Sequence, residues 1–236
     1  MLDKATRKAI EKKLGYRFRK RSRLEAALTH PSYRHENEGV KADNQRLEFL
    51  GDAALGLAAA ADLYERHQDH PEGTLTHRRS LLTNRNTLAR IGRALDLGAC
   101  LRLGRGEELS GGRTRASNLT DAVEAIIGAV YLDGGQKAVD KVYKKLWAAH
   151  WPEVDSQYTD NPKGKLQEYC QKKWKASPVY RISEESGPPH ARLYTCVAVI
   201  RDKEYGAGQA LNKRAAEAQA AEATLRQLTE SDLSAD

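Results

Sequence analysis

The sequence predicts a two-domain protein: an all-α domain over residues 1–150, followed by a small α+β domain with the order α-β-β-β-α over residues 161–229. Three observations carry this prediction. Apolar side chains recur at helical spacing throughout residues 1–150. The stretch 151–160, "WPEVDSQYTD", is polar and contains a proline, which is typical of a linker. Beyond it the composition shifts towards Val, Ile, Tyr and Thr, which favour strands.

In the first domain, the apolar pattern predicts helices that cover residues 47–67, 81–97 and 121–135. Two glycine-containing stretches, "HPEGTLTH" at 70–77 and "LGRGEELSGGRTR" at 103–115, are typical of loops between helices. No segment of this domain alternates apolar and polar residues for long, so we expect no sheet here.

In the second domain, "KLQEYCQKKW" predicts a helix, and two strand-like stretches follow it. The longer of these, "ARLYTCVAVIRDKEYGAGQA", contains a polar "RDKE" turn and predicts a hairpin. The alanine-rich "NKRAAEAQAAEATLRQL" predicts a closing helix. Residues 230–236 are polar, and we expect a disordered tail there.

The composition limits the function classes. The formal net charge is +7, which favours an anionic partner. The three cysteines are widely separated and lack metal-ligand spacing, so we expect a reduced, cytoplasmic protein. The basic N-terminal stretch lacks the apolar core of a secretory signal, and no apolar run is long enough for a membrane span. We therefore expect no membrane partner.

Two pairs of acidic residues lie within strongly apolar helical patterns. Glu48 and Asp52 are four residues apart and Asp121 and Glu124 are three apart, so each pair shares one helix face. Two helices that each contribute such a pair could gather four carboxylates around one point. Oxygen ligands without His or Cys fit Mg²⁺ or Mn²⁺ better than zinc. Beside a basic surface, such a centre suits phosphodiester cleavage.

Structural roles for the same residues stay open at this point. Asp121 could cap its helix, with Glu124 completing a capping box. Glu48 and Asp52 could form salt bridges with nearby arginines, namely Arg46, Arg78 or Arg79. Spacing alone does not decide between these roles and a metal centre.

Longer matches favour the metal centre. "RLEFLGDAALG" closely resembles the signature segment of the ribonuclease III family, and "DAVEAIIGAVYLD" resembles its second acidic motif. The flanking segments "LGYRFRKRSRLEAALTHPSY", "TNRNTLARIGRALDLG" and "LRLGRGEELSGGRTR" agree with that family. The C-terminal part resembles a double-stranded RNA-binding domain, so the resemblance covers nearly the whole chain.

This resemblance implies a homodimer that cleaves double-stranded RNA, such as ribosomal RNA precursors and structured transcripts. It implies 5′-phosphate and 3′-hydroxyl ends with short 3′ overhangs. Mg²⁺ is the implied cofactor, with Mn²⁺ as a substitute. The resemblance assigns catalysis and metal binding to four carboxylates: Glu48, Asp52, Asp121 and Glu124.

Other positions receive supporting roles from the resemblance. Phe49 matches an aromatic residue at the dimer interface, and Glu72 and Asn86 match positions at the edge of the active site. Gln45 stands where the family most often has Glu. The amide keeps an acceptor oxygen but loses the charge, so we expect altered substrate contacts or metal dependence before loss of activity.

In the C-terminal domain, Gln167 and Glu168 resemble minor-groove contacts on the first helix, and His190 lies in a loop that enters a second minor groove in related domains. Lys213 and Arg214 begin the last helix, where the helix N-terminus also favours phosphate. Glu217 departs from a basic residue often found there. In the nuclease domain, the RNA backbone or solvent could meet four arginines: Arg102, Arg105, Arg113 and Arg115.

We therefore predict a Mg²⁺-dependent endoribonuclease that acts on double-stranded RNA. The alternative is a non-catalytic double-stranded RNA-binding protein that retains the fold. Gln45 is the only feature of the sequence that favours this alternative. An unrelated helical metalloprotein would leave the C-terminal domain unexplained.

Overall fold

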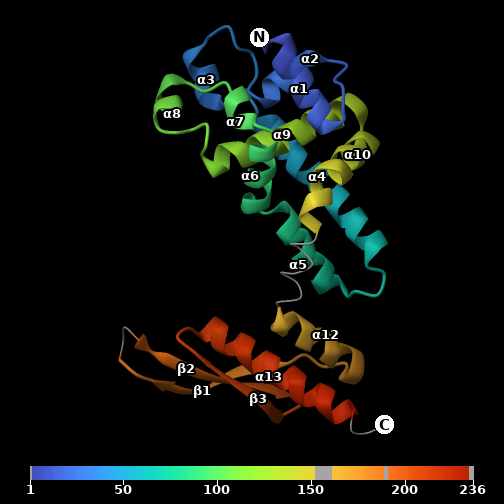
Figure 1. Ribbon diagram of the computed structural model, residues 1–236, viewed down its shortest axis with the longest axis vertical. Helices are drawn as coiled ribbons and strands as arrows, with labels where there is room; N and C mark the ends of the chain where they lie inside the picture. The colour runs from blue at the N-terminus through green and yellow to red at the C-terminus, as the bar shows by residue number, and fades with distance from the viewer. Residues whose placement is uncertain (1, 152–160, 189–190, 234–236) are drawn as a thin grey trace. The chain divides into compact units, whose positions relative to one another are not determined.

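The computed structural model describes residues 2–151, 161–188 and 191–233 (Figure 1). The chain divides into two compact units, Met1–Val154 and Asp155–Asp236. The first unit is helical, and the second combines a three-stranded sheet with helices. This architecture confirms the predicted fold class. Within the described ranges, no helix is both long and apolar enough to cross a membrane.

The first unit consists of helices joined by short connections, and its one isolated strand-like bridge in the described region pairs Thr29 with Arg102. Its elements are α1 (Lys4–Leu14), α2 (Arg21–Ala27), α3 (Pro31–Glu36), α4 (Gln45–Arg66), α5 (Glu72–Thr83), α6 (Arg85–Ala94), α7 (Leu97–Cys100), α8 (Arg105–Leu109), α9 (Ala116–Gly134), α10 (Gln136–Trp147) and the 3₁₀ turn η1 (Ala148–His150).

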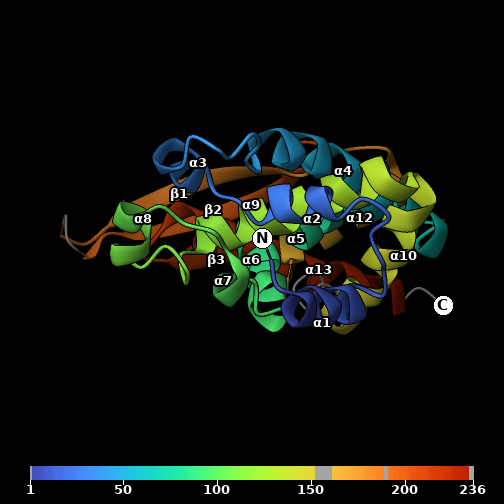
Figure 2. The ribbon, with the colours of Figure 1, turned by 90° about the horizontal axis from the view of Figure 1, so that it is seen from above.

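Helix α9 is the central element of this unit. It packs against α2, α4, α6, α7 and α10, and most of its residues are buried. Figure 2 shows α9 in the interior, between α4 and α6. A helix that is apolar on nearly all sides is stable only when other elements surround it. The apolar pattern after Asp121 therefore dictates that this helix becomes the core.

Helices α4 and α9 touch backbone to backbone at two glycines. A Cβ atom added to Gly51 would lie 1.7 Å from the carbonyl oxygen of Glu124. A Cβ atom added to Gly128 would lie 2.1 Å from the carbonyl oxygen of Leu47. Both distances are far inside van der Waals contact, so only glycine permits this crossing. The close approach fixes the acidic residues of α4 next to those of α9.

Two local expectations for this unit were wrong. Residues 70–77 are not all loop, because α5 begins at Glu72 directly after Pro71, and proline commonly precedes the first turn of a helix. Residues 81–97 do not form one helix, because the chain breaks at Asn84 between α5 and α6. The Asn84 side chain accepts a hydrogen bond from the Thr87 amide, which makes it the N-cap of α6. The predicted loop 103–115 also contains the short helix α8.

The second unit contains α12 (Pro162–Trp174), β1 (Val179–Ser186), β2 (Leu193–Ile200), β3 (Lys203–Ala210) and α13 (Lys213–Leu233). The strands form an antiparallel sheet in the order β1-β2-β3. Arg201 and Asp202 connect β2 to β3 with positive φ angles at both positions, as a tight hairpin turn requires. The predicted hairpin is thereby confirmed.

Helix α13 packs on β2 and β3, and α12 packs on α13. Small residues permit this close packing. A Cβ atom at Gly206 or Gly208 of β3 would lie 2.4 Å from the Thr224 nitrogen or 2.3 Å from the Ala220 nitrogen, respectively. The alanine-rich composition of α13 thus serves the contact with the sheet.

The ends of the predicted segments shift slightly. Helix α13 continues to Leu233, past residue 229, so residues 230–233 are not the disordered tail that we expected. The predicted linker 151–160 lies outside the described residues except for Trp151, which packs against the core of the first unit.

Asp133, near the end of α9, anchors the segment between α1 and α2. Its buried carboxylate accepts hydrogen bonds from the Tyr16 hydroxyl and the Arg19 amide at 2.8 Å each, and from the Lys20 amide at 3.1 Å. The Arg23 guanidinium donates a fourth bond at 2.8 Å. Burial alone would raise the pKa of Asp133, but these donors outweigh it and lower the pKa from 3.8 to about 2.

Asp133→Asn is expected to lower the free energy of unfolding by about 2 to 4 kcal/mol, because it removes the charge that these buried donors require. The pKa of Asp133 is lowered on folding, so its stabilisation is present above about pH 4 and is lost as the pH falls towards about 2. Urea unfolding between these pH values measures both effects. Asp69→Asn, at an exposed position, is the matched control, and an equal loss in both variants would contradict the assignment.

Gly51→Ala is expected to force α4 away from α9 and to lower the free energy of unfolding by about 3 kcal/mol or more, because the added methyl group meets backbone that cannot move aside. Gly56→Ala is the matched control in the same helix, because nothing lies within 4 Å of its added Cβ atom. Because alanine has a higher helix propensity than glycine, Gly56→Ala should leave the free energy of unfolding unchanged or raise it by up to about 1 kcal/mol. If thermal unfolding shows the same change in stability for both variants, the proposed backbone contact at Gly51 is wrong.

Candidate active site

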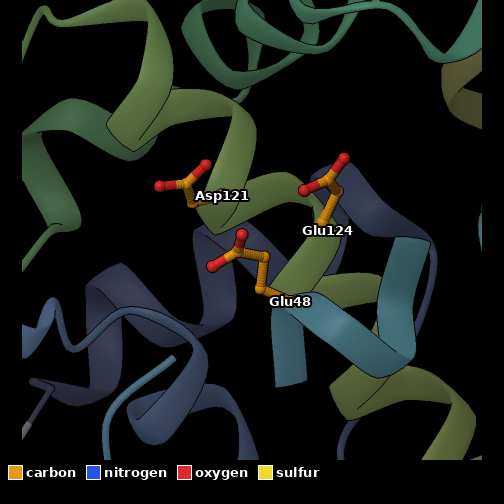
Figure 3. Close-up of side chains that lie close together, drawn as sticks. All are labelled: Glu48, Asp121 and Glu124. Atoms are coloured by element: carbon orange, nitrogen blue, oxygen red, sulfur yellow. The ribbon is translucent and has the colours of Figure 1, made fainter. Parts of the chain in front are cut away.

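Three acidic side chains converge where α4 crosses α9. Glu48 lies in the first turn of α4, and Asp121 and Glu124 lie one turn apart on α9. Each offers a carboxylate oxygen, and these oxygens all lie within 4.8 Å of one another. Figure 3 shows the three carboxylates gathered on one side of the helix crossing. All three are half-buried, so solvent and ligands still reach them.

Asp52, the fourth predicted carboxylate, lies one turn after Glu48 on α4 and is exposed. It does not belong to the group within 4.8 Å. Its charge nevertheless raises the pKa of both Glu48 and Glu124, which places it beside the cluster. The structure therefore brings three predicted ligands together and leaves Asp52 at their edge.

Electrostatic repulsion dominates this cluster. Burial, followed by the charges of Asp52, Asp121 and Glu48, raises the pKa of Glu124 from 4.5 to about 8. Burial and neighbouring carboxylates also raise the pKa of Glu48, and burial raises that of Asp121. Like charges held this close require protons or a cation. The all-oxygen donor set fits a hard divalent cation such as Mg²⁺ or Mn²⁺.

The structural roles considered for these residues do not hold. Helix α9 begins at Ala116, so Asp121 lies inside the helix and is not its cap. Among the described residues, neither Glu48 nor Asp52 forms an ion pair with an arginine. The Arg78 guanidinium instead donates to His67 Nε2 at 3.2 Å. Neither a capping box nor a salt bridge accounts for the acidic cluster.

The accessory positions lie outside the group of three carboxylates. Gln45 is the exposed first residue of α4, and its backbone N–H donates a hydrogen bond to the Asp43 side chain. Glu72 is the exposed first residue of α5 and accepts a hydrogen bond from the Thr76 hydroxyl at 2.8 Å. Asn86 is exposed in α6. The roles of these three residues in catalysis stay predictions.

Two basic side chains that the sequence did not single out lie near Asp121. Interactions with His30 and Arg85 both act to lower the pKa of Asp121, against the effect of burial. His30 caps α3, and its Nδ1 accepts from the Ser32 amide at 3.2 Å. Arg85 begins α6, next to Asn86. Two features of the sequence could have pointed to these residues. His30 lies in the "THPSY" segment that resembles the family, and Arg85 is adjacent to Asn86, which was predicted near the active site.

The second unit presents its predicted RNA contacts on two helices. Gln167 is exposed on α12, and Glu168 is half-buried beside it. Lys213 and Arg214 are exposed at the start of α13, where the Asn212 side chain accepts from the Ala215 amide and caps the helix. His190 lies outside the described residues. Tyr169 and Trp174 pack against the core of this unit, and Val197 is buried.

Three of the four arginines around the loop 103–115 have structural partners, whereas the Arg105 side chain is exposed. Arg113 forms an ion pair with Glu108 and donates to the Gly98 and Leu101 carbonyls. Arg115 forms an ion pair with Glu107 at 2.5 Å. Arg102 lies over the Tyr33 ring. These contacts stabilise the local fold around residues 98–118.

Comparison with known proteins identifies the family of each unit. The family model "Ribonuclease-III-like" matches residues 21–150, and the "Double-stranded RNA binding motif" matches residues 162–228. Ribonuclease 3 of Ruegeria pomeroyi is 42% identical over 95% of this chain and 98% of its own length. Ribonuclease 3 of Moorella thermoacetica is 45% identical over 86% of both chains.

A solved structure is similar as well. The nuclease domain of ribonuclease III from Campylobacter jejuni is 35% identical, with a TM-score of 0.57, and the match covers 61% of this chain and 95% of that one. The helical fold, the acidic cluster and the matched families agree. The chain belongs to the ribonuclease III family, with an endoribonuclease domain followed by a double-stranded RNA-binding motif.

Proposed function

We propose that this protein hydrolyses double-stranded RNA with Mg²⁺ as its cofactor, leaving 5′-phosphate and 3′-hydroxyl ends. The observation that carries the proposal is the convergence of Glu48, Asp121 and Glu124 within 4.8 Å, with Asp52 beside them. Ribosomal RNA precursors and structured transcripts in the cytoplasm are the substrates that we propose.

In this mechanism, Glu48, Asp121 and Glu124 would hold the cation, and Asp52 beside them would add negative charge to the site. The cation supplies Lewis-acid activation of water and of the scissile phosphate. The oxygen of a water molecule forms a bond to phosphorus and the bond from phosphorus to the 3′ oxygen breaks. The water loses one proton and the 3′ oxygen takes one up, so that a single water molecule supplies both new ends. The chain contributes a preorganised anionic site in which the carboxylates are aligned before substrate arrives.

We also propose that the protein acts as a homodimer through an apolar face of α4. Phe49, Leu57 and Tyr64 recur at helical spacing on α4 and are 81%, 57% and 72% exposed. Tyr131 and Leu132 of α9 are exposed too. Large apolar side chains gathered in this way favour a protein partner. A related structure from Campylobacter jejuni is described by a region involved in dimer formation.

A two-fold dimer would supply two copies of the acidic cluster, so each copy could cut one strand of a duplex. An offset between the two cuts leaves the short 3′ overhangs that we expect. Phe49 therefore belongs to the proposed interface and lies next to the metal-binding Glu48 in sequence.

Metal affinity should depend on pH through Glu124. The pKa of this carboxyl is raised to about 8 without a cation, so binding must displace its proton below that pH. The apparent affinity for Mn²⁺ should rise about tenfold per pH unit from about pH 6 to 8 and then level off. Isothermal titration of the RNA-free protein measures this, and Glu124→Gln should bind weakly at every pH. An affinity that is flat across this range would contradict the assignment.

The reaction itself is tested by incubating the protein with a fully paired RNA duplex in Mg²⁺ and, separately, in Ca²⁺. We expect short duplexes with 5′-phosphates in Mg²⁺, and binding without cleavage in Ca²⁺, whose larger and looser coordination supports catalysis poorly. Glu124→Gln should bind RNA but lose at least about 10³-fold in cleavage rate.

Binding without cleavage in both Mg²⁺ and Mn²⁺ would reject the enzymatic proposal in favour of the non-catalytic alternative. Gln45→Glu would then show whether that position is the cause. If the wild-type protein does cleave, the same substitution should change the metal concentration that gives half-maximal rate before it changes the products.

A further inference from the structure

Two carboxylates lie among the cations at the start of α13 in the second unit. Glu185, near the end of β1, contacts the Lys213 Nζ at 2.9 Å and the Arg192 guanidinium at 3.4 Å. Lys213 also lies over the Tyr194 ring, with its Nζ 5.2 Å from the ring centroid. The first residue of α13 is therefore held by a carboxylate from a different element.

Glu217 repeats this arrangement one turn further along α13. Its Oε2 lies 2.5 Å from the Nζ of Lys163 in the first turn of α12. The same Nζ lies 4.6 Å from the centroid of the Tyr180 ring. The ion pair thus joins α12 to α13 beside β1.

Both pairs are open to solvent, so a polyanion can reach them. The Lys213 side chain is 56% exposed and the Lys163 side chain 37%. An incoming phosphate must therefore compete with a carboxylate that is already in contact with each lysine. Arg214, next to Lys213, forms no ion pair within the described residues and offers its charge without this competition.

We propose that Glu185 and Glu217 are intramolecular competitors of RNA phosphate, which lower the affinity of the second unit for RNA and reduce its salt dependence. The inference rests on the proposed function of this unit in RNA binding. Each phosphate contact normally releases about one counterion and steepens the dependence of affinity on salt. A lysine that stays paired with a carboxylate neutralises phosphate less completely, so fewer of the cations condensed on the RNA are released, and the neighbouring carboxylate repels the duplex.

The test is fluorescence anisotropy of the full-length protein with a labelled RNA duplex of about 20 base pairs, from about 50 to 300 mM KCl. EDTA and a Glu124→Gln background prevent cleavage. The variants are Glu185→Gln, Glu217→Gln and both together. We expect each to raise the affinity about threefold at about 100 mM KCl and to steepen the slope of log affinity against log salt by about one.

Glu222→Gln is the matched control. Glu222 lies on the same helix, pairs with Arg226 at 2.6 Å, and its substitution changes the net charge by the same amount. It lies more than one turn beyond Glu217, away from the start of the helix. Its slope should match that of the parent protein, so the comparison separates a local effect from net charge.

Two outcomes would overturn the inference while leaving the proposed function intact. If Glu185→Gln binds RNA more weakly, the carboxylate orients Lys213 instead of competing for it. If Glu185→Gln and Glu222→Gln give equal slopes, only net charge matters. Parent protein that binds no duplex at all would instead reject the RNA-binding function. Thermal unfolding measures whether each variant is folded. Glu217→Gln removes the ion pair between α12 and α13, and if this variant is unfolded, the Glu185→Gln variant alone tests the inference.

Discussion

The backbone contact between α4 and α9 is the constraint on which the active site depends. Gly51 and Gly128 let the two helices approach until each would collide with a Cβ atom on the other. At this separation Glu48 of α4 reaches the pair on α9, and three carboxylate oxygens fall within 4.8 Å (Figure 3). Because α9 is buried by its neighbours, the position of these carboxylates is set by the packing of the whole unit and not by a surface loop.

The packing holds carboxylates together although their charges repel one another. A comparison of two carboxylates in α9 shows the effect of the two environments. Asp133 is buried near the end of α9, and four donors lower its pKa to about 2. Glu124 lies earlier in the same helix among other carboxylates, and burial and repulsion raise its pKa to about 8. The first environment stabilises the fold, whereas the second destabilises it unless a cation or a proton is bound. Functional sites are expected to carry such unfavourable local energies, which the remainder of the fold offsets.

Local patterns in the sequence predicted the helical unit, the hairpin and the acidic pairs, because each depends on residues a few positions apart. The same patterns failed at Asn84, where apolar periodicity continues across a break that one capping side chain creates. They also failed to reveal His30 beside Asp121, and the contact between Lys163 and Glu217. These partners come from different helices, so only the packed structure brings them together. The separation of Asp52 from the other three carboxylates likewise follows from the geometry of the crossing and not from spacing.

The neutral side chain at Gln45 has a physical reading in this electrostatic setting. Gln45 is the first residue of α4, three residues before Glu48 and exposed to solvent. A carboxylate there would add negative charge to a cluster in which repulsion already raises the pKa of Glu124 to about 8. An amide keeps an oxygen that can accept a hydrogen bond from water or from an RNA hydroxyl, yet it adds nothing to that repulsion. With Gln at this position we expect weaker competition between protons and a cation at neutral pH than with Glu. The consequence of Gln45 is therefore expected first in metal dependence or substrate contacts, before any loss of activity.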